Sequence, residues 1–155
     1  MVVAELGAAF AGVIFAGGPR HVTALRARGI LAAVEGTDVR RVGVFGSQEV
    51  DEVVRTADVA SLHVIQLHHA ATEDSVGSLR ARFDGQIWAV LGVSGASIAA
   101  PVLARALALA DVVDALVLDT AVAGRSGGTG VVFDWMSVAP ALAPLRARTR
   151  LVVAG

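Results

Sequence analysis

The sequence predicts an α/β fold built on a parallel sheet, and two observations lead to this prediction. Six short aliphatic runs alternate along the chain with longer amphipathic segments. The runs are dense in Val, Ile and Leu at successive positions, as expected for parallel strands that are covered on both faces. Because this alternation is typical of right-handed βαβ units, we expect either a (β/α) barrel or an open doubly wound sheet.

The expected strands and helices follow one another without a long linker. We expect strands at residues 11–16, 40–46, 61–68, 86–93, 114–120 and 150–155. Helices are expected between them, at residues 21–35, 48–58, 73–83, 97–110 and 133–148. Three residues favour helix starts at these places, namely Ser47 and Thr72 as N-caps and Pro101 in a first turn.

Both ends of the chain interrupt this pattern. The first residues are typical of the end of a helix that runs into the strand at 11–16, and the sequence stops at Gly155 directly after a strand. A parallel strand without its following helix exposes apolar surface. We therefore expect one domain over residues 1–155, with its ends missing.

The composition excludes several classes of protein. Hydrophobic residues make up 55% of the 155 residues, yet no apolar run approaches the roughly 18 residues that span a bilayer. We expect a soluble protein, and the formal net charge of −1 argues against nucleic-acid and anionic-membrane binding. The absence of cysteine and lysine excludes disulfides, thiolate ligands and lysine Schiff bases within this sequence.

Asp119 is the sharpest candidate for chemistry. Ligands of parallel α/β folds bind at the carboxyl ends of the strands, and Asp119 closes the aliphatic run ALVL. A partly desolvated carboxyl group suits general acid catalysis. An N-cap or loop-ordering aspartate is an equally good interpretation of the residue alone.

The motif SGGTG at residues 126–130 is the strongest local signal. Successive glycines let backbone N–H groups approach an anion or let a loop fold tightly. The motif is neither a P-loop nor GxGxxG, and its position favours a phosphate loop over a flexible turn.

Other polar residues follow the remaining expected strands. Arg20 could pair with a carboxylate or phosphate, although a solvated loop arginine is the simpler interpretation. Gln66, His68 and His69 could bind a ligand. Because adjacent strand residues point to opposite faces, the pair His68–His69 is a poor metal site, and we expect no metal.

Six segments in order resemble a known enzyme family. The segments AGVIFAGGPRHVT, RRVGVF, VIQLH, ALVLDT, SGGTGVVFDW and RLVVAG occur in the order and spacing of phosphoribosylanthranilate isomerase. The resemblance covers essentially the whole chain. It implies a TIM (β/α)8 barrel, incomplete here, with about family strands two to seven present.

The resemblance also implies a reaction and its residues. The family catalyses an Amadori rearrangement of an aminoaldose in tryptophan biosynthesis, part of aromatic amino acid biosynthesis in the cytoplasm, without a cofactor. Asp119 matches the general acid that protonates the ribose ring oxygen. Arg20 matches the contact to the anthranilate carboxylate, and Gln66 and His68 match residues that line the substrate pocket.

Glycines complete the implied site. Gly127, Gly128 and Gly130 match the loop that closes near the substrate. Gly155 matches the first glycine of a pair that helps to hold the phosphate.

The sequence departs from the family pattern in two important respects. The family opens with a strand that carries a cysteine, the base that removes the C2 proton, and this sequence has no cysteine. Six strands also cannot close an eight-stranded barrel on their own. Gly92 stands where the family often has a basic residue.

The main hypothesis is therefore an isomerase of N-(5-phosphoribosyl)anthranilate, with a small phosphorylated substrate and no nucleic-acid or membrane partner. The alternative is a non-catalytic barrel fragment or pseudoenzyme without the general base, which binds a phosphorylated metabolite or a partner chain. An unrelated open α/β module that binds a phosphorylated metabolite is a third hypothesis. The oligomeric state and a second aminoaldose substrate stay open.

Overall fold

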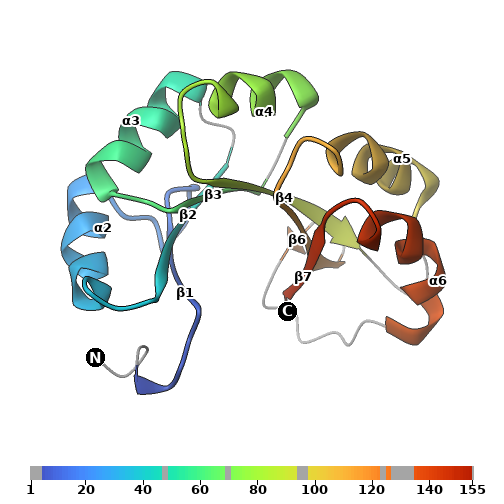
Figure 1. Ribbon diagram of the computed structural model, residues 1–155, viewed down its shortest axis with the longest axis horizontal. Helices are drawn as coiled ribbons and strands as arrows, with labels where there is room; N and C mark the ends of the chain where they lie inside the picture. The colour runs from blue at the N-terminus through green and yellow to red at the C-terminus, as the bar shows by residue number, and fades with distance from the viewer. Residues whose placement is uncertain are drawn as a thin grey trace.

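The strands of the protein form one curved sheet, with the helices in an arc on its outer side (Figure 1). This computed structural model describes residues 5–46, 49–68, 71–93, 98–122, 125–126 and 135–154. The strands are β1 Phe10–Ile14, β2 Arg40–Phe45, β3 Val64–Leu67, β4 Gln86–Val93, β5 Ala115–Val122, β6 Arg125–Ser126 and β7 Arg150–Ala154.

Six of these strands are parallel and lie side by side in chain order. β1 pairs with β2, β2 with β3, β3 with β4, β4 with β5, and β5 with β7, whereas the two-residue β6 pairs with β5 in the antiparallel sense. A doubly wound sheet reverses its strand order and carries helices on both faces. Neither feature occurs in the described sheet, so the chain forms a half-barrel of the (β/α)8 type and the barrel prediction is confirmed.

The helices occur where the sequence predicts them, most of them with shorter ends, whereas α3 extends two residues beyond its predicted end at residue 58. They are α2 Ala24–Leu31, a 3₁₀ turn Ala32–Val34, α3 Val50–Ala60, α4 Glu73–Arg80, α5 Ala100–Leu109 and α6 Trp135–Arg146. No helix in the described ranges is long and apolar enough to cross a membrane.

Two of the three expected helix starts are confirmed. Thr72 caps α4, and Pro101 lies in the first turn of α5. Glu49 takes the N-cap position of α3 without a side-chain hydrogen bond, and Ser47 lies outside the described residues.

The predicted start of the strand at 61–68 is wrong. Ser61 ends α3 as its C-cap with a φ of 51°, in the left-handed region, and β3 begins only at Val64. The amide of Leu62 donates to the Ala57 carbonyl at 2.9 Å. Residues 61 and 62 therefore finish the helix, although their composition suits a strand.

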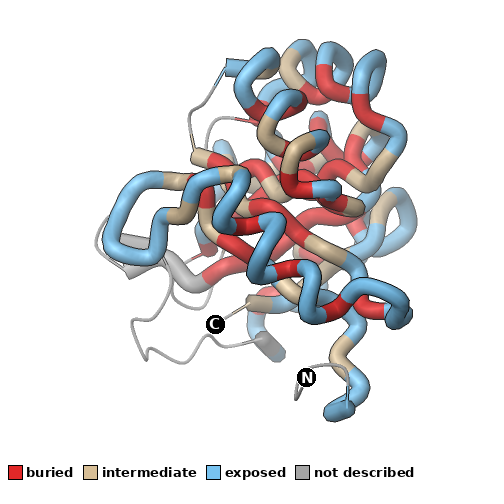
Figure 2. The backbone as a smooth tube through the Cα atoms, turned by 90° about the vertical axis from the view of Figure 1, so that its left-hand side faces the viewer, coloured by how far each residue is buried: buried red, intermediate tan, exposed pale blue. Residues whose placement is uncertain are grey.

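Alternation along the strands separates two apolar layers. The outer layer packs against the helices and holds most of the buried side chains, including Phe45, Ile65, Ile87 and Leu116. Figure 2 shows the buried positions gathered along the strands and on the helix sides that face them. The packing is tight at Gly43, where an added Cβ would lie 2.9 Å from the rings of Phe15 and Phe45.

The inner face of the sheet carries a smaller apolar cluster. Its buried members are Val42, Val64, Trp88, Val90, Ala115 and Val117. Because side chains alternate along a strand, the next inward positions toward the carboxyl ends are Gln66 and His68 after Val64, Gly92 after Val90, and Asp119 after Val117. We call this inner cluster the apolar floor, because the predicted polar residues follow it along the strands on the same face of the sheet.

Candidate functional site

Asp119 lies at the carboxyl end of β5 on the inner face of the sheet. Its register partners are Gly92 on β4 and Ala154 on β7. Only 7% of the residue is exposed, and among the described residues it is the only buried polar or charged one. Burying a carboxyl group costs free energy unless hydrogen bonds or opposite charges compensate for the lost contact with water.

His68 provides one such partner. Its Nε2 lies 3.5 Å from Oδ2 of Asp119, and the two side chains are 20% and 10% exposed. The backbone amide of His68 donates to the Phe45 carbonyl at 2.8 Å, which extends the β2–β3 ladder by one residue. The predicted site residues His68 and Asp119 are therefore brought together.

Gln66 lies on β3, two residues before His68 and on the same face. It pairs in register with Val44 on β2 and Trp88 on β4, and it is partly exposed. The side chain therefore stands between the apolar floor and the His68–Asp119 pair, in a position to line a ligand site.

Gly92 lies on the inner face beside Asp119 and is exposed. The inward residues before it on β4, Trp88 and Val90, are both 4% exposed. The apolar floor thus ends at Gly92, and at the level of Asp119 the inner face of β4 carries a glycine without a side chain. Sequence reasoning noted Gly92 only as a departure from the family pattern.

Arg20 lies in the turn between β1 and α2. The turn uses a φ of 113° at Gly18 and closes when the His21 amide donates to the Gly18 carbonyl at 3.1 Å. Arg20 is exposed. Arg20 therefore lies at the same end of the sheet as Asp119, in the turn that leads into α2.

Gly127, Gly128, Gly130 and Gly155 lie outside the described residues. Within the part of the chain that the structure describes, no group of three or more His, Asp or Glu side chains is arranged to hold a metal ion.

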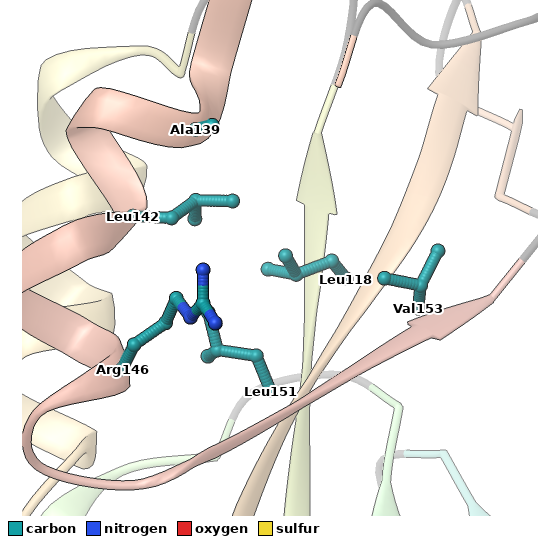
Figure 3. A pocket seen from close by; sticks show the side chains of 6 residues that line it. All are labelled: Leu118, Ala139, Leu142, Arg146, Leu151 and Val153. Carbon is teal, nitrogen blue, oxygen red and sulfur yellow. The ribbon is translucent and has the colours of Figure 1, made fainter. Parts of the chain in front are cut away.

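A cavity of about 360 Å³ lies on the opposite face of β5, under α6. Figure 3 shows Leu118, Leu151 and Val153 from the strands and Leu142 from α6 around it. Arg146 is its one charged lining residue. Leu118 points outward and Asp119 inward, so this cavity is separated from the Asp119 site by the sheet.

Comparison with known proteins adds independent information. The sequence model of the N-(5′-phosphoribosyl)anthranilate (PRA) isomerase family matches residues 2–155. The N-(5′-phosphoribosyl)anthranilate isomerase of Brevibacillus brevis is 34% identical over 151 residues, which cover 97% of this chain and 66% of that protein.

Two solved structures are similar in fold. The phosphoribosyl anthranilate isomerase of Thermotoga maritima superimposes with a TM-score of 0.79 at 28% identity, over 99% of this chain and 70% of that one. A phosphoribosyl anthranilate isomerase in complex with reduced 1-(o-carboxyphenylamino)-1-deoxyribulose 5-phosphate gives 0.73 at 26% identity, over 98% of this chain and 67% of that one. The chain spans about two thirds or less of the length of the first curated relatives that it matches.

Proposed function

The chain belongs to the N-(5′-phosphoribosyl)anthranilate isomerase family, and on this premise we propose that it serves the Amadori rearrangement of N-(5-phosphoribosyl)anthranilate. The reaction converts an aminoaldose to an aminoketose and needs no redox partner, since substrate and product are isomers. A cytoplasmic location accords with this step of tryptophan biosynthesis.

The observation that carries the proposal is the buried carboxyl group of Asp119 at the carboxyl end of β5. In the proposed mechanism it donates a proton to the ring oxygen of the ribose. The bond between C1 and that oxygen breaks, and C1 and the anthranilate nitrogen form an iminium. Burial supports this role because a water-poor site strengthens the interaction of the carboxyl group with the charge that develops.

Three other residues have proposed binding roles. The guanidinium of Arg20 pairs with the anthranilate carboxylate, a planar anion that suits its paired donors. Gln66 and His68 line the site beside Asp119. The remaining proposed contacts come from the family resemblance alone. They are the loop near the substrate, with Gly127, Gly128 and Gly130, and the phosphate contact of Gly155.

The second half of the reaction needs a base. A proton must leave C2 of the iminium to give the enol, which then becomes the ketose. The family resemblance assigns that step to a cysteine, and the sequence contains none. Turnover by these 155 residues therefore requires another group to take the C2 proton, whereas binding and ring opening do not.

Binding and turnover are thus tested separately. We expect the purified chain to bind reduced 1-(o-carboxyphenylamino)-1-deoxyribulose 5-phosphate in calorimetry. Arg20→Gln should weaken that binding about tenfold or more, because one charged contact is lost. Arg28→Gln is the matched control, since Arg28 is an exposed arginine in the last turn of α2, the helix that follows Arg20.

Turnover is followed by the change in substrate fluorescence. If the chain isomerises the substrate, Asp119→Asn should lower kcat by about 100-fold or more while the analogue still binds. Full turnover by Asp119→Asn would contradict the role of Asp119. Tight analogue binding without turnover in the wild type would support the pseudoenzyme alternative, and no binding of the analogue at all would contradict the proposed function.

A further inference from the structure

The contact between His68 and Asp119 joins two strands that are not neighbours in the sheet. β4 lies between β3 and β5, yet Nε2 of His68 lies 3.5 Å from Oδ2 of Asp119. We propose that His68 is the positioning residue of Asp119: it holds Oδ2, so that Oδ1 is the oxygen that delivers the proton. This inference deepens the proposed function and rests on it.

The sheet geometry makes the contact possible. Asp119 pairs directly with Gly92, and Gly92 follows Trp88 and Val90 on the inner face of β4. A larger residue at position 92 would place its side chain on the inner face directly beside the carboxyl group. Glycine leaves that space open, and the histidine ring reaches across the intervening strand.

The backbone holds the histidine in place. Its amide donates to the Phe45 carbonyl at 2.8 Å, so that the residue continues the parallel ladder although β3 ends at Leu67. The side chain is one-fifth exposed, which restricts the ring to few orientations. A donor anchored in this way loses little entropy when it holds the carboxyl group.

The hydrogen-bonding roles follow from the chemistry of the two groups. When Asp119 is the protonated acid, Oδ2 is its carbonyl oxygen and accepts a hydrogen bond from Nε2–H, while Oδ1–H points to the substrate. After proton transfer the carboxylate is charged, and the same bond becomes stronger. The interaction therefore favours the state that forms during ring opening, which is the requirement for catalysis.

The distance of 3.5 Å is longer than the 2.7–2.9 Å of a charge-assisted hydrogen bond. Catalytic hydrogen bonds in ligand-free sites are commonly long and shorten when substrate binds. We therefore expect substrate to draw His68 and Asp119 closer together. A residue that only lines the pocket would contact the substrate and leave Asp119 unchanged.

The first test does not depend on turnover. Proton–nitrogen NMR of the imidazole rings should show the His68 proton on Nε2, with His68→Gln identifying the signals among the four histidines. Asp119→Ala should shift the Nε2 resonance of His68, and the control Asp111→Asn, at the amino end of the sheet, should not. An unchanged Nε2 resonance in Asp119→Ala would overturn the proposal.

The second test uses the split between kcat and KM. His68→Leu should lower kcat by about 100-fold, well beyond any rise in KM from its place in the pocket lining, and His68→Gln, which keeps an N–H donor, should recover a large part of the lost kcat. A rise in KM at constant kcat would overturn the positioning role and make His68 a substrate contact. No turnover in the wild type would contradict the proposed function. The NMR experiment would then still show whether His68 holds the carboxyl group of Asp119.

Discussion

The two histidines that flank β3 experience opposite environments at the two ends of the sheet. His68 faces the carboxyl group of Asp119 at the carboxyl end. His63, at the amino end, accepts a hydrogen bond on Nδ1 from the Arg41 amide at 3.0 Å, and its Nε2 lies 3.2 Å from Nη2 of Arg41. Burial lowers the pKa of His63 below its ordinary 6.5, and the nearby charges of Arg41 and Arg40 lower it further.

This environment predicts a pH dependence of stability. Because the pKa of His63 is lower in the folded state, the unfolded state takes up the proton first as the pH falls. The stability contributed by the neutral ring is present above pH 6.5 and is lost as the pH falls through the folded pKa. Urea midpoints measured from about pH 7.5 down to about pH 5 should therefore fall less steeply for His63→Gln than for the wild type.

A matched variant distinguishes this effect from a general loss of stability. His21 is exposed, so His21→Gln should keep the wild-type slope. Equal slopes for the wild type and His63→Gln would show that His63 does not couple folding to pH.

At the scale of elements, α4 begins through a reciprocal pair of hydrogen bonds. The Thr72 hydroxyl accepts from the Ser75 amide at 3.1 Å, and the Ser75 hydroxyl accepts from the Thr72 amide at 3.0 Å. Glu73 and Asp74 add negative charge in the first turn, which favours the helix dipole. The start of this short helix is thus encoded locally.

Removing the cap should be measurable. Thr72→Ala leaves the Ser75 amide without its acceptor and should lower the free energy of unfolding by about 1 kcal/mol in urea titrations. Ser78→Ala changes an exposed position of the same helix and should stay within about 0.5 kcal/mol of the wild type. Similar losses in both variants would assign the effect to helix propensity rather than to the cap.

At the scale of the whole molecule, two arginine–aspartate pairs connect successive strand–helix units at the amino end of the sheet. Arg80, the last residue of α4, donates to Oδ2 of Asp114 at 2.7 Å, and the same oxygen accepts from the Ile87 amide of β4 at 2.7 Å. Arg148 makes a second connection, to Asp111, with Nε 2.9 Å from Oδ1. These contacts join the α4, β4, β5 and β7 segments at the end opposite the candidate site.

The two connections should differ in strength. Asp114→Ala leaves the amide of the buried Ile87 without its acceptor and should cost about 1–3 kcal/mol of unfolding free energy. Asp111 is 55% exposed and Arg148 is 41% exposed, so Asp111→Ala should cost about 0–1 kcal/mol. Equal costs in urea unfolding would mean that the amide of Ile87 finds another partner.

Several elements could be predicted because their signals are local. The β4 bounds at 86 and 93, the Thr72 cap and the position of Pro101 each follow from a few neighbouring residues. The start of β3 could not, since residues 61 and 62 suit a strand by composition and are held in the α3 terminus by the left-handed Ser61. Apolar composition indicates which segments are buried, but it does not indicate where a helix ends.

The sequence alone determined the alternation of strands and helices, the family resemblance, and Asp119 as the acid candidate, because each is carried by short segments and by their order along the chain. Only the tertiary structure decided that His68 meets Asp119 across β4 and that Gly92 leaves the space between them. The reason is that contacts between non-neighbouring strands depend on the curvature and stagger of the whole sheet, which no local pattern encodes.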